Sequence, residues 1–354
     1  MEVRIELCWS LGTAQAEPLE PQLLQLLQYI HERGSLQVAA KARGISYRHA
    51  WGLMQKWEGR LGQPLARLER GRGATLTALG HKLLWGQRRI NARLGPELES
   101  LASELAAELR DAMQIESPLL RVFASHGLAI PLLRELLHAK RRIRLDLQFR
   151  GSLDSVRSLR SSKCDVAGFH VPEGSLGARL APRFRRWLDP KTDVLIHAVR
   201  RRQGWITPKD NPKGMRSVAD LGRGELQFVN RQPGSGTRMI FDLLLQDSGI
   251  APERIKGYSA EEFTHLAVAA MVASGAADAG FGIEAAARHF GLDFIPVTWE
   301  NYWFALKRDA LAGFAVSELL SMLRSAEFIA RAGALPGYDP SQAGVITQVD
   351  SVIA

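Results

Sequence analysis

Apolar residues recur at helical spacing in the N-terminal part of the chain. A helix with one buried face is predicted after Ser46, which is placed to cap it. Ser35 can cap a shorter helix just before, and Gly44 supplies the residue without a side chain that a tight turn between crossing helices requires. The spacings of four and three that define the buried face join Ala50, Met54, Trp57 and Leu61.

A two-stranded hairpin is predicted directly after these helices. The runs 65–70 and 74–77 flank Gly71-Arg72-Gly73, a turn sequence that would carry an arginine at its tip. Two crossing helices followed by such a hairpin are typical of a winged helix-turn-helix. We therefore expect residues 1–84 to form a DNA-binding domain of α+β type, with the first turn of the helix after Ser46 facing base edges.

Charge is concentrated in this module. Residues 31–93 hold 13 Lys and Arg against 3 Asp and Glu, a net charge of +10, whereas the whole chain carries +9. A basic field confined to one module is expected of a protein that binds the phosphate backbone of double-stranded DNA. The remainder of the chain is close to neutral.

A long helical pattern follows, from Thr77 as N-cap to about Gln114, and we assign residues 85–117 to a linker helix. An apolar stripe runs along one of its faces, and Pro96 is expected to kink or restart the helix. The stripe could pack on its own domain or against the same helix of a second subunit. We favour a homodimer, because a two-fold protein matches a two-fold operator. The stripe consists of Leu94, Leu98, Leu101, Leu105 and Leu109.

From about residue 118 short β-branched or aromatic runs alternate with helical patterns. This alternation predicts an α/β domain over residues 118–354, built on a parallel sheet with helices on both faces. The expected strands are 120–124, 143–149, 166–171, 194–199, 226–230, 279–282 and 294–296.

Three junctions between a strand and the following helix share one chemistry, namely small residues, a hydroxyl and backbone amides at a helix N-terminus. A single serine there is more often only a helix cap. Three such ends at the carboxyl edge of one sheet favour a shared anion site, because helix N-termini carry partial positive charge. The junctions are Ser125-His126-Gly127, Gly151-Ser152 and the segment from Asn230 to Arg238.

The N-terminal motifs resemble the winged helix-turn-helix of the molybdate-responsive ModE-type regulators, which are kin of the LysR-type DNA-binding domain. The segments that carry the likeness are 34–40, 44–51 and 71–77 with Gly80. In that family the second helix enters the major groove and the wing contacts the backbone. The resemblance implies DNA contacts for Gln37, Ser46, Tyr47, Arg48, His49, Lys56, Arg70 and Arg72.

The segment 230–238, followed by 275–282, resembles the periplasmic-binding-protein-like domain that accompanies molybdenum-related proteins. The likeness covers roughly residues 118–330 and implies a two-lobed clamp, the second lobe spanning about 200–295. Asp278 would lie near the cleft, although a turn residue is an equally good interpretation. The implied ligand-binding residues are Ser125, His126, Gly151, Ser152, Asn230, Arg231, Gly234, Ser235, Gly236, Thr237, Arg238, Asp278 and Tyr302.

Several ligands and functions fit these patterns. Hydroxyl and amide donors suit molybdate or tungstate, whereas His126, Arg231 and Arg238 would also suit a molybdenum-cofactor precursor or another phosphorylated metabolite. A hydrolase built from Ser125, His126, Asp154 and Asp278 is the enzymatic alternative, but no nucleophile-elbow motif supports it. An architectural protein with an inactive ligand domain is disfavoured by the donors retained in residues 234–238. We therefore expect a one-component sensor without a catalytic cofactor.

The composition of the chain limits its domain number, its cysteine chemistry and its location. With 46% hydrophobic residues the chain can fill the cores of two or three domains. Its only cysteines, Cys8 and Cys164, lie far apart and lack neighbours at metal-site spacing, so neither a disulfide framework nor a metal site is expected. Charged residues interrupt the N-terminus and no apolar run is long enough to span a bilayer, so we expect a cytoplasmic protein.

Overall fold

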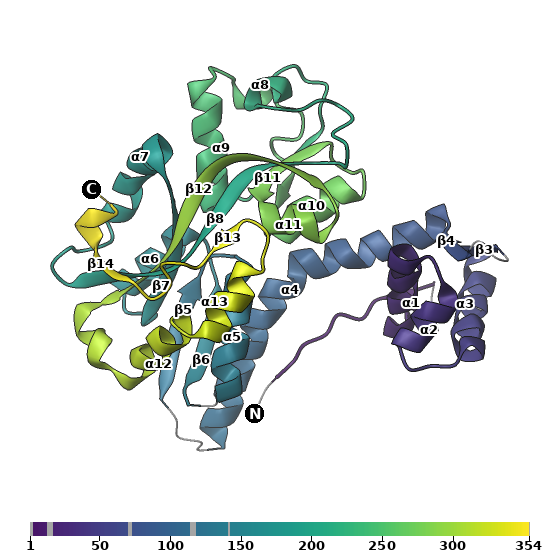
Figure 1. Ribbon diagram of the computed structural model, residues 1–354, viewed down its shortest axis with the longest axis horizontal. Helices are drawn as coiled ribbons and strands as arrows, with labels where there is room; N and C mark the ends of the chain where they lie inside the picture. Colours follow the sequence, from purple (N-terminus) through teal and green to yellow (C-terminus); the bar gives the residue numbers. More distant parts are fainter. Residues whose placement is uncertain (1–2, 13–16, 70–72, 114–117, 141, 354) are drawn as a thin grey trace. The chain divides into compact units, whose positions relative to one another are not determined.

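The computed structural model describes residues 3–12, 17–69, 73–113, 118–140 and 142–353 (Figure 1). The chain divides into two compact units, one made of residues 6–91 and the other built mainly of residues 92–354. Among the described helices none is long and apolar enough to cross a membrane.

The unit of residues 6–91 is the expected helix-turn-helix with a hairpin. The side chain of Ser35 accepts a hydrogen bond from the amide of Val38, and that of Ser46 from the amide of His49, so both predicted caps are confirmed. Gly44 takes a φ of +67°, as the predicted turn requires. The elements are β1 (Ser10–Leu11), β2 (Glu17–Pro18), α1 (Pro21–Arg33), α2 (Leu36–Ala42), α3 (Tyr47–Leu61), β3 (Ala66–Glu69) and β4 (Gly73–Leu76). Strands β3 and β4 pair antiparallel, which confirms the described part of the predicted wing.

The long helix α4 (Ala78–Ala112) begins after Thr77, whose hydroxyl accepts from the amide of Gly80 at 3.2 Å. The predicted restart at Pro96 is wrong, because the helix continues through this residue. Proline cannot donate to the carbonyl four residues earlier, which belongs to Ala92. The hydroxyl of Thr264 donates to that carbonyl instead, at 2.6 Å.

The C-terminal half of α4 packs along β6 (Arg144–Phe149), the edge strand of the large sheet. The hydroxyl of Ser103 accepts from the amide of Leu147 at 3.1 Å, and that of Ser100 accepts from the amide of Phe149 at 3.0 Å. Two strand amides that face away from the sheet are thereby paired. The predicted stripe lies elsewhere on the helix, and Leu101, Leu105 and Leu109 are 40–47% exposed.

The second unit is built on one large mixed sheet. Its strand order is β10-β9-β11-β8-β12-β7-β5-β6, with β13 and β14 also paired to β8. The predicted all-parallel sheet is wrong, because β8 runs antiparallel to β11 and β12, and β12 runs antiparallel to β7. The remaining strands are β5 (Leu119–Ala124), β7 (Val166–Pro172), β8 (Asp193–Thr207), β9 (Phe228–Arg231), β10 (Glu261–Glu262), β11 (Ala279–Ile283), β12 (Asp293–Lys307), β13 (Tyr338–Asp339) and β14 (Ile346–Gln348).

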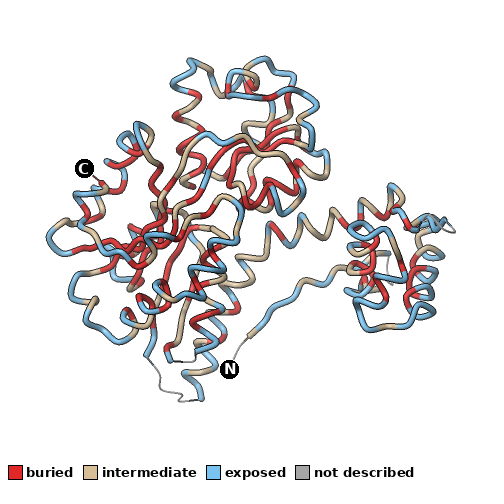
Figure 2. Tube along the Cα trace, in the orientation of Figure 1, coloured by how far each residue is buried: buried red, intermediate tan, exposed pale blue. Residues whose placement is uncertain are grey.

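Alternating side chains of this sheet feed two separate cores. Along β12, Tyr302, Phe304 and Leu306 enter one core, whereas Trp303 and Ala305 enter the other. Both faces are therefore buried under helices, as Figure 2 shows by the buried strands in the middle of the unit. The covering helices are α5 (Ala129–Lys140), α6 (Ser152–Arg160), α7 (Gly174–Arg185), α8 (Val218–Leu221), α9 (Gly236–Asp247), α10 (His265–Ala273), α11 (Glu284–His289), α12 (Phe314–Leu323) and α13 (Ala326–Gly333). Short 3-10 turns cover 252–254, 308–312 and 349–351.

The sheet supports two lobes of α/β structure, as predicted. One lobe carries β5, β6 and β7 with α5, α6, α7, α12 and α13, and the other carries β9, β10 and β11 with α8 to α11 (Figure 1). The long strands β8 and β12 pass through both lobes. Their middle portions, near residues 200–203 and 298–301, lie where the lobes meet.

Candidate anion site between the two lobes

A small cavity opens where the lobes meet. The helices α6, α9 and α10 direct their N-terminal residues Ser152, Gly236 and His265 toward it. These ends present backbone amides and partial positive charge, which together bind anions. The cavity is lined by Ser125, His126, Arg150, Gly151, Ser152, His170, Arg201, Arg231, Gln232, Ser235, Gly236, Thr237 and His265.

The structure brings the three predicted junctions together. Residues Ser125 and His126 follow β5, Gly151 and Ser152 follow β6, and the third junction follows β9. The glycine at 151 lets the two lobes approach, since a Cβ there would lie 3.2 Å from the carbonyl oxygen of Gly234. Eight of the predicted ligand-binding residues line the cavity. They are Ser125, His126, Gly151, Ser152, Arg231, Ser235, Gly236 and Thr237.

Two buried arginines line the site. The guanidinium of Arg201 is neutralised, because its Nε contacts the carboxylate of Glu300 at 2.5 Å. That of Arg231 donates to backbone carbonyls instead, at 3.2 Å to Glu262 and 2.9 Å to Phe263. Burial and the neighbouring Arg201 lower the pKa of Arg231 to about 9. None of the described residues that line the cavity is acidic, although the carboxylates of Glu300 and Glu262 lie close enough to attract Arg231.

Several polar atoms at this place have no hydrogen-bond partner among the described residues. They include the Nη1 of Arg231, the Oγ of Ser152 and the Nε2 of His170, all buried. A buried polar group without a partner costs about 1–3 kcal/mol. Three such atoms gather at one cavity, where a ligand or water molecules could pair with them.

The three histidines of the cavity are held neutral. Burial and the two arginines lower the pKa of His126 to about 3, and they lower the pKa values of His170 and His265 well below the usual range. The Nε2 of His265 faces the guanidinium of Arg201 at 3.4 Å, and because arginine can only donate, the proton of this imidazole lies on Nδ1. The Nδ1 of His170 lies 2.8 Å from the Oγ of Ser125, so this pair shares one proton and still offers another to a ligand.

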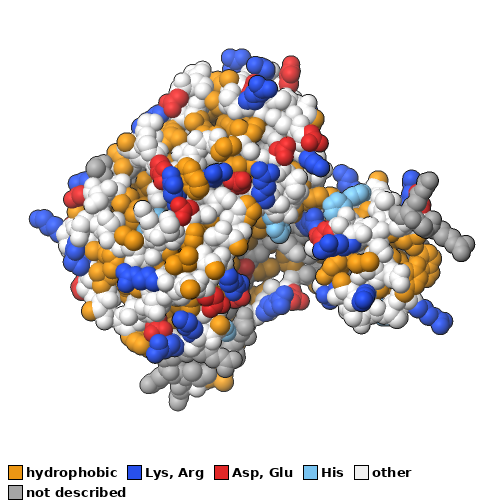
Figure 3. Space-filling view, viewed as in Figure 1, with side chains coloured by type: hydrophobic (Ala, Val, Ile, Leu, Met, Phe, Trp, Pro, Cys, Tyr) orange, Lys and Arg blue, Asp and Glu red, His pale blue; other side chains and the backbone are white. Residues whose placement is uncertain are grey.

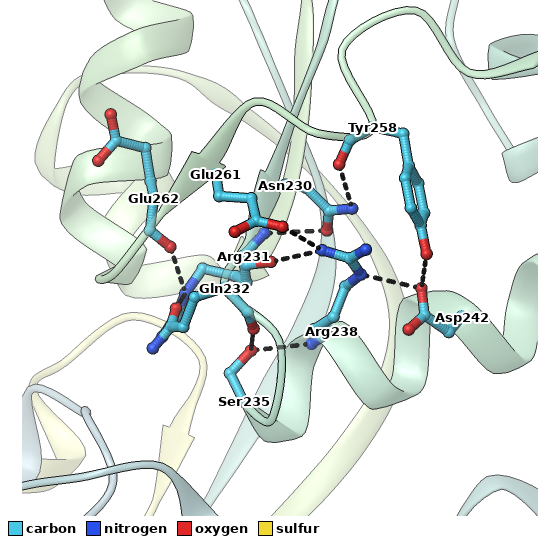
Figure 4. A network of polar contacts seen from close by, with 9 residues as sticks. All are labelled: Asn230, Arg231, Gln232, Ser235, Arg238, Asp242, Tyr258, Glu261 and Glu262. Atoms are coloured by element: carbon cyan, nitrogen blue, oxygen red, sulfur yellow. Dashed lines mark hydrogen bonds and ion pairs between the residues drawn. The ribbon is translucent and has the colours of Figure 1, made fainter. Parts of the chain in front are cut away.

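Five predicted residues lie outside the lining of the cavity. The guanidinium of Arg238 pairs with Asp242 at 3.0 Å and with Glu261 at 3.2 Å (Figure 4). The same group lies over the aromatic ring of Tyr258. It cannot also serve the ligand. The others are Asn230, which donates to the carbonyl of Tyr258, Gly234 in the preceding loop, Asp278, which pairs with Lys213 at 2.8 Å, and Tyr302, whose hydroxyl donates to the carbonyl of Ser125 at 3.1 Å.

Other lining residues were not predicted from the sequence. Arg201 belongs to the run Arg200-Arg201-Arg202-Gln203 within β8, and such a polar run inside an otherwise apolar strand is the signal that could have located it. The position of His265 at a helix start resembles that of the predicted serines. Arg150, His170 and Gln232 carried no comparable signal, because strand register and loop path place them.

The predicted DNA-binding residues occupy the exposed side of α2 and α3. Gln37, Tyr47, Arg48 and His49 are exposed, and Ser46 is the helix cap. Lys56 differs, since its ammonium contacts Glu20 at 2.6 Å and Glu17 at 3.4 Å. Lys and Arg side chains lie over the surface of this unit in Figure 3. The predicted wing residues Arg70 and Arg72 lie outside the described part of the chain.

The four residues of the hydrolase alternative do not come together in the structure. Asp154 is an exposed residue that contacts Arg157 at 3.3 Å, and Asp278 contacts Lys213 and the amide of Gln227. Neither carboxylate lines the cavity that contains Ser125 and His126. Across the described residues no group of three or more His, Cys, Asp and Glu is placed to hold a metal ion.

Comparisons with known proteins bear on both units. Residues 133–324 match the model of the PBP superfamily domain, and residues 21–81 match the bacterial regulatory helix-turn-helix protein of the lysR family. The chain is 34% identical over 200 residues to the uncharacterized protein YvgK of Bacillus subtilis (strain 168), and the match covers 56% of this chain and 64% of the relative. The chain thus matches less than two thirds of the length of that relative.

A second curated relative is the uncharacterized protein in the ferredoxin 2Fe-2S gene 5′ region of Clostridium pasteurianum, which is 38% identical over 99 residues, covering 28% of this chain and 88% of the relative. A hydrogen peroxide-bound OxyR mutant of Corynebacterium glutamicum is similar in fold, with a TM-score of 0.44 and 17% identity over 89% of this chain and 93% of that chain. The chain belongs to the PBP superfamily, and the segment 21–81, which precedes the domain of that superfamily, matches the helix-turn-helix model of the lysR family.

Proposed function

We propose that this chain is a DNA-binding transcriptional regulator whose two-lobed domain binds a compact oxyanion of the molybdate and tungstate class and alters operator binding in response. The observation that carries the ligand part is the buried guanidinium of Arg231, whose Nη1 has no hydrogen-bond partner among the described residues, in a cavity whose described lining has no carboxylate. A tetrahedral dianion would add negative charge beside this guanidinium and accept from the unpartnered donors.

The lining supports a compact ligand over a pterin-type metabolite. The described residues that line the cavity include no Phe, Tyr or Trp on which a pterin ring could stack. The donors converge from both lobes, because Ser152 comes from one and Arg231 from the other. An anion between them therefore stabilises the closed arrangement in proportion to its differential affinity for that arrangement.

The DNA part of the proposal rests on the LysR-family match over residues 21–81 and on the surface of α3. Its first turn presents Tyr47, Arg48 and His49 to solvent, the position from which a recognition helix reaches base edges. We further propose a homodimer formed through the exposed stripe of α4, which contains Leu101, Leu105 and Leu109.

A matched pair of serines tests the ligand proposal. Ser152 and Ser155 lie on the same helix, both are fully buried, and the hydroxyl of each has no hydrogen-bond partner among the described residues. Only Ser152 lines the cavity. Replacing either by alanine removes an unsatisfied hydroxyl, so neither variant should unfold more easily than the wild type in the absence of anion.

Their response to anion should differ. A ligand at a hundredfold excess over Kd stabilises by about 2.7 kcal/mol, which corresponds to roughly 5–10 °C in Tm for a domain of this size. We expect tungstate and molybdate to raise the Tm of the wild type and of Ser155→Ala, and Ser152→Ala to need about tenfold more anion for the same rise. Sulfate and phosphate are the comparison anions. If no anion raises the Tm, or if both variants respond like the wild type, the cavity is not an oxyanion site.

A further inference from the structure

A short segment of the second lobe, residues 262–265, joins the anion cavity to helix α4. Residues that line the cavity hold one end of this segment and form the other. At one end the guanidinium of Arg231 holds the carbonyls of Glu262 and Phe263, and at the other end His265 lines the cavity as the first residue of α10. The register of β10 on β9 places Glu262 directly beside Arg231 (Figure 4).

The middle of the same segment contacts α4 at two points. The hydroxyl of Thr264 donates to the carbonyl of Ala92 at 2.6 Å, and this hydroxyl also caps α10 by accepting from the amide of Ala267 at 2.9 Å. Arg93 lies over the ring of Phe263 at 5.8 Å and places its Nε 3.9 Å from the carboxylate of Glu262. The backbone carbonyl of Ala92 and the side chain of Arg93 thus both contact the segment.

Pro96 makes this attachment specific. In a regular helix the carbonyl of Ala92 would accept from the amide of residue 96, but proline has no amide hydrogen. A buried carbonyl without a donor is costly, so the hydroxyl of Thr264 satisfies a need that this one position of α4 has. Pro96 removes the helical donor to this carbonyl, and Thr264 supplies a donor in its place.

We propose that residues 262–265 transmit the state of the anion cavity to α4 through the contact between Thr264 and the carbonyl that Pro96 leaves without a helical partner. This inference rests on the proposed function for its ligand. An anion that draws on the free Nη1 of Arg231 and on His265 changes the forces on both ends of the segment. The resulting displacement of Thr264 is passed to α4 at Ala92. From residue 92 this helix continues back to the helix-turn-helix. Thr264 is therefore a positioning residue and does not contact the ligand.

Hydrogen–deuterium exchange of the full chain tests this route. The reporter is the peptide covering residues 88–100, and the perturbation in the absence of anion is Arg231→Lys, which keeps the charge but loses the fork that holds two carbonyls. We expect this substitution to accelerate exchange in the reporter by about fivefold or more, the lower end of typical couplings. The same substitution in a Thr264→Val background should change the reporter less than twofold, whereas Thr264→Ser, which retains the hydroxyl, should behave like the wild type.

Pro96→Ala provides a second variant outside the lobe. It returns an amide donor to the carbonyl of Ala92 without touching the cavity, so it should also abolish the response to Arg231→Lys. The inference is overturned if the reporter fails to respond to Arg231→Lys in the wild type, or if the response survives equally in Thr264→Val and Pro96→Ala.

Sodium tungstate at 1 mM forms a separate arm. It should slow exchange in peptides covering 150–155 and 231–238, and also in the reporter. Absence of any change in the two cavity peptides counts against the proposed ligand, while the arm with Arg231→Lys still decides whether the route exists. Protection of the cavity peptides in wild type without any change in the reporter counts against the route alone.

Discussion

Lowering the pH from 7.5 to 5.5 should destabilise the anion-free protein through His126. Its ring stacks on Phe149 at 4.9 Å, and burial together with Arg231 and Arg201 holds its pKa at about 3. In the unfolded chain the same imidazole titrates near pH 6.5. Between pH 7.5 and 5.5 this imidazole therefore becomes protonated in the unfolded state but stays neutral in the folded state. The free energy of unfolding consequently falls as the pH falls.

The size of this effect follows from the two pKa values. With about 6.5 in the unfolded chain and about 3 in the folded chain, proton linkage removes roughly 1.4 kcal/mol of stability between pH 7.5 and 5.5. His170 and His265 are lowered in the same direction, mainly by burial, so they add to the loss. The cavity should consequently make the anion-free domain sensitive to mild acid.

Guanidinium unfolding of the full chain at the two pH values measures this sensitivity. The comparison is between the wild type and His126→Gln, because groups that do not interact with His126 contribute equally to both proteins. We expect the free energy of unfolding to fall by about 1.4 kcal/mol less in the variant than in the wild type when the pH drops from 7.5 to 5.5. His138→Gln, which changes an exposed histidine of α5, serves as the control and should keep the dependence of the wild type.

Tungstate should oppose the effect at the site. A dianion close to the imidazoles favours their charged forms, so it raises their pKa values and binds more tightly as the pH falls. The reasoning is refuted if His126→Gln and wild type lose the same stability on acidification. It is equally refuted if tungstate affinity declines between pH 7.5 and 5.5.

Further outcomes are expected from the other surfaces. In DNA binding measured by fluorescence anisotropy, Arg48→Ala should relax sequence preference by about 1–3 kcal/mol, whereas Arg72→Ala should weaken all duplexes alike, and equal losses on every duplex for both would contradict this division. Charge at both Leu101 and Leu105 should give monomers in sedimentation, and an unchanged dimer would place the interface elsewhere. Ser125→Ala should weaken anion binding, and neither it nor the wild type should hydrolyse esters, phosphates or nucleotides. A turnover that this substitution abolishes would revive the hydrolase hypothesis.

Local patterns were sufficient to predict much of the fold. The caps at Ser35 and Ser46 and the start of α4 after Thr77 depend on nearby residues only, and the structure confirms them. The direction of β8 and β12 was not predictable in this way. A buried strand is apolar whichever way it runs, so the pattern could not distinguish a mixed sheet from a parallel one.

The candidate site was predicted where chemistry is local and missed where it depends on long-range packing. Ser152 and Ser235 stand at helix starts that the sequence reveals. Arg238 stands beside them in sequence, but its helix turns it toward Asp242 and Tyr258, and only the fold decides that. Arg201 reaches the cavity from the middle of a strand, because two long strands cross between the lobes.

The serines of α4 that pair with β6 also affect solubility. An edge strand with free amides is a template on which a second chain can add a strand, and natural proteins cover such edges or interrupt them. Here the hydroxyls of Ser100 and Ser103 accept hydrogen bonds from two of those amides. Detachment of α4 would expose a ready edge for intermolecular β-pairing. Helix α4 thus also protects this edge from pairing with another chain, and on the proposed route from the anion cavity this contact would limit how far the helix can move.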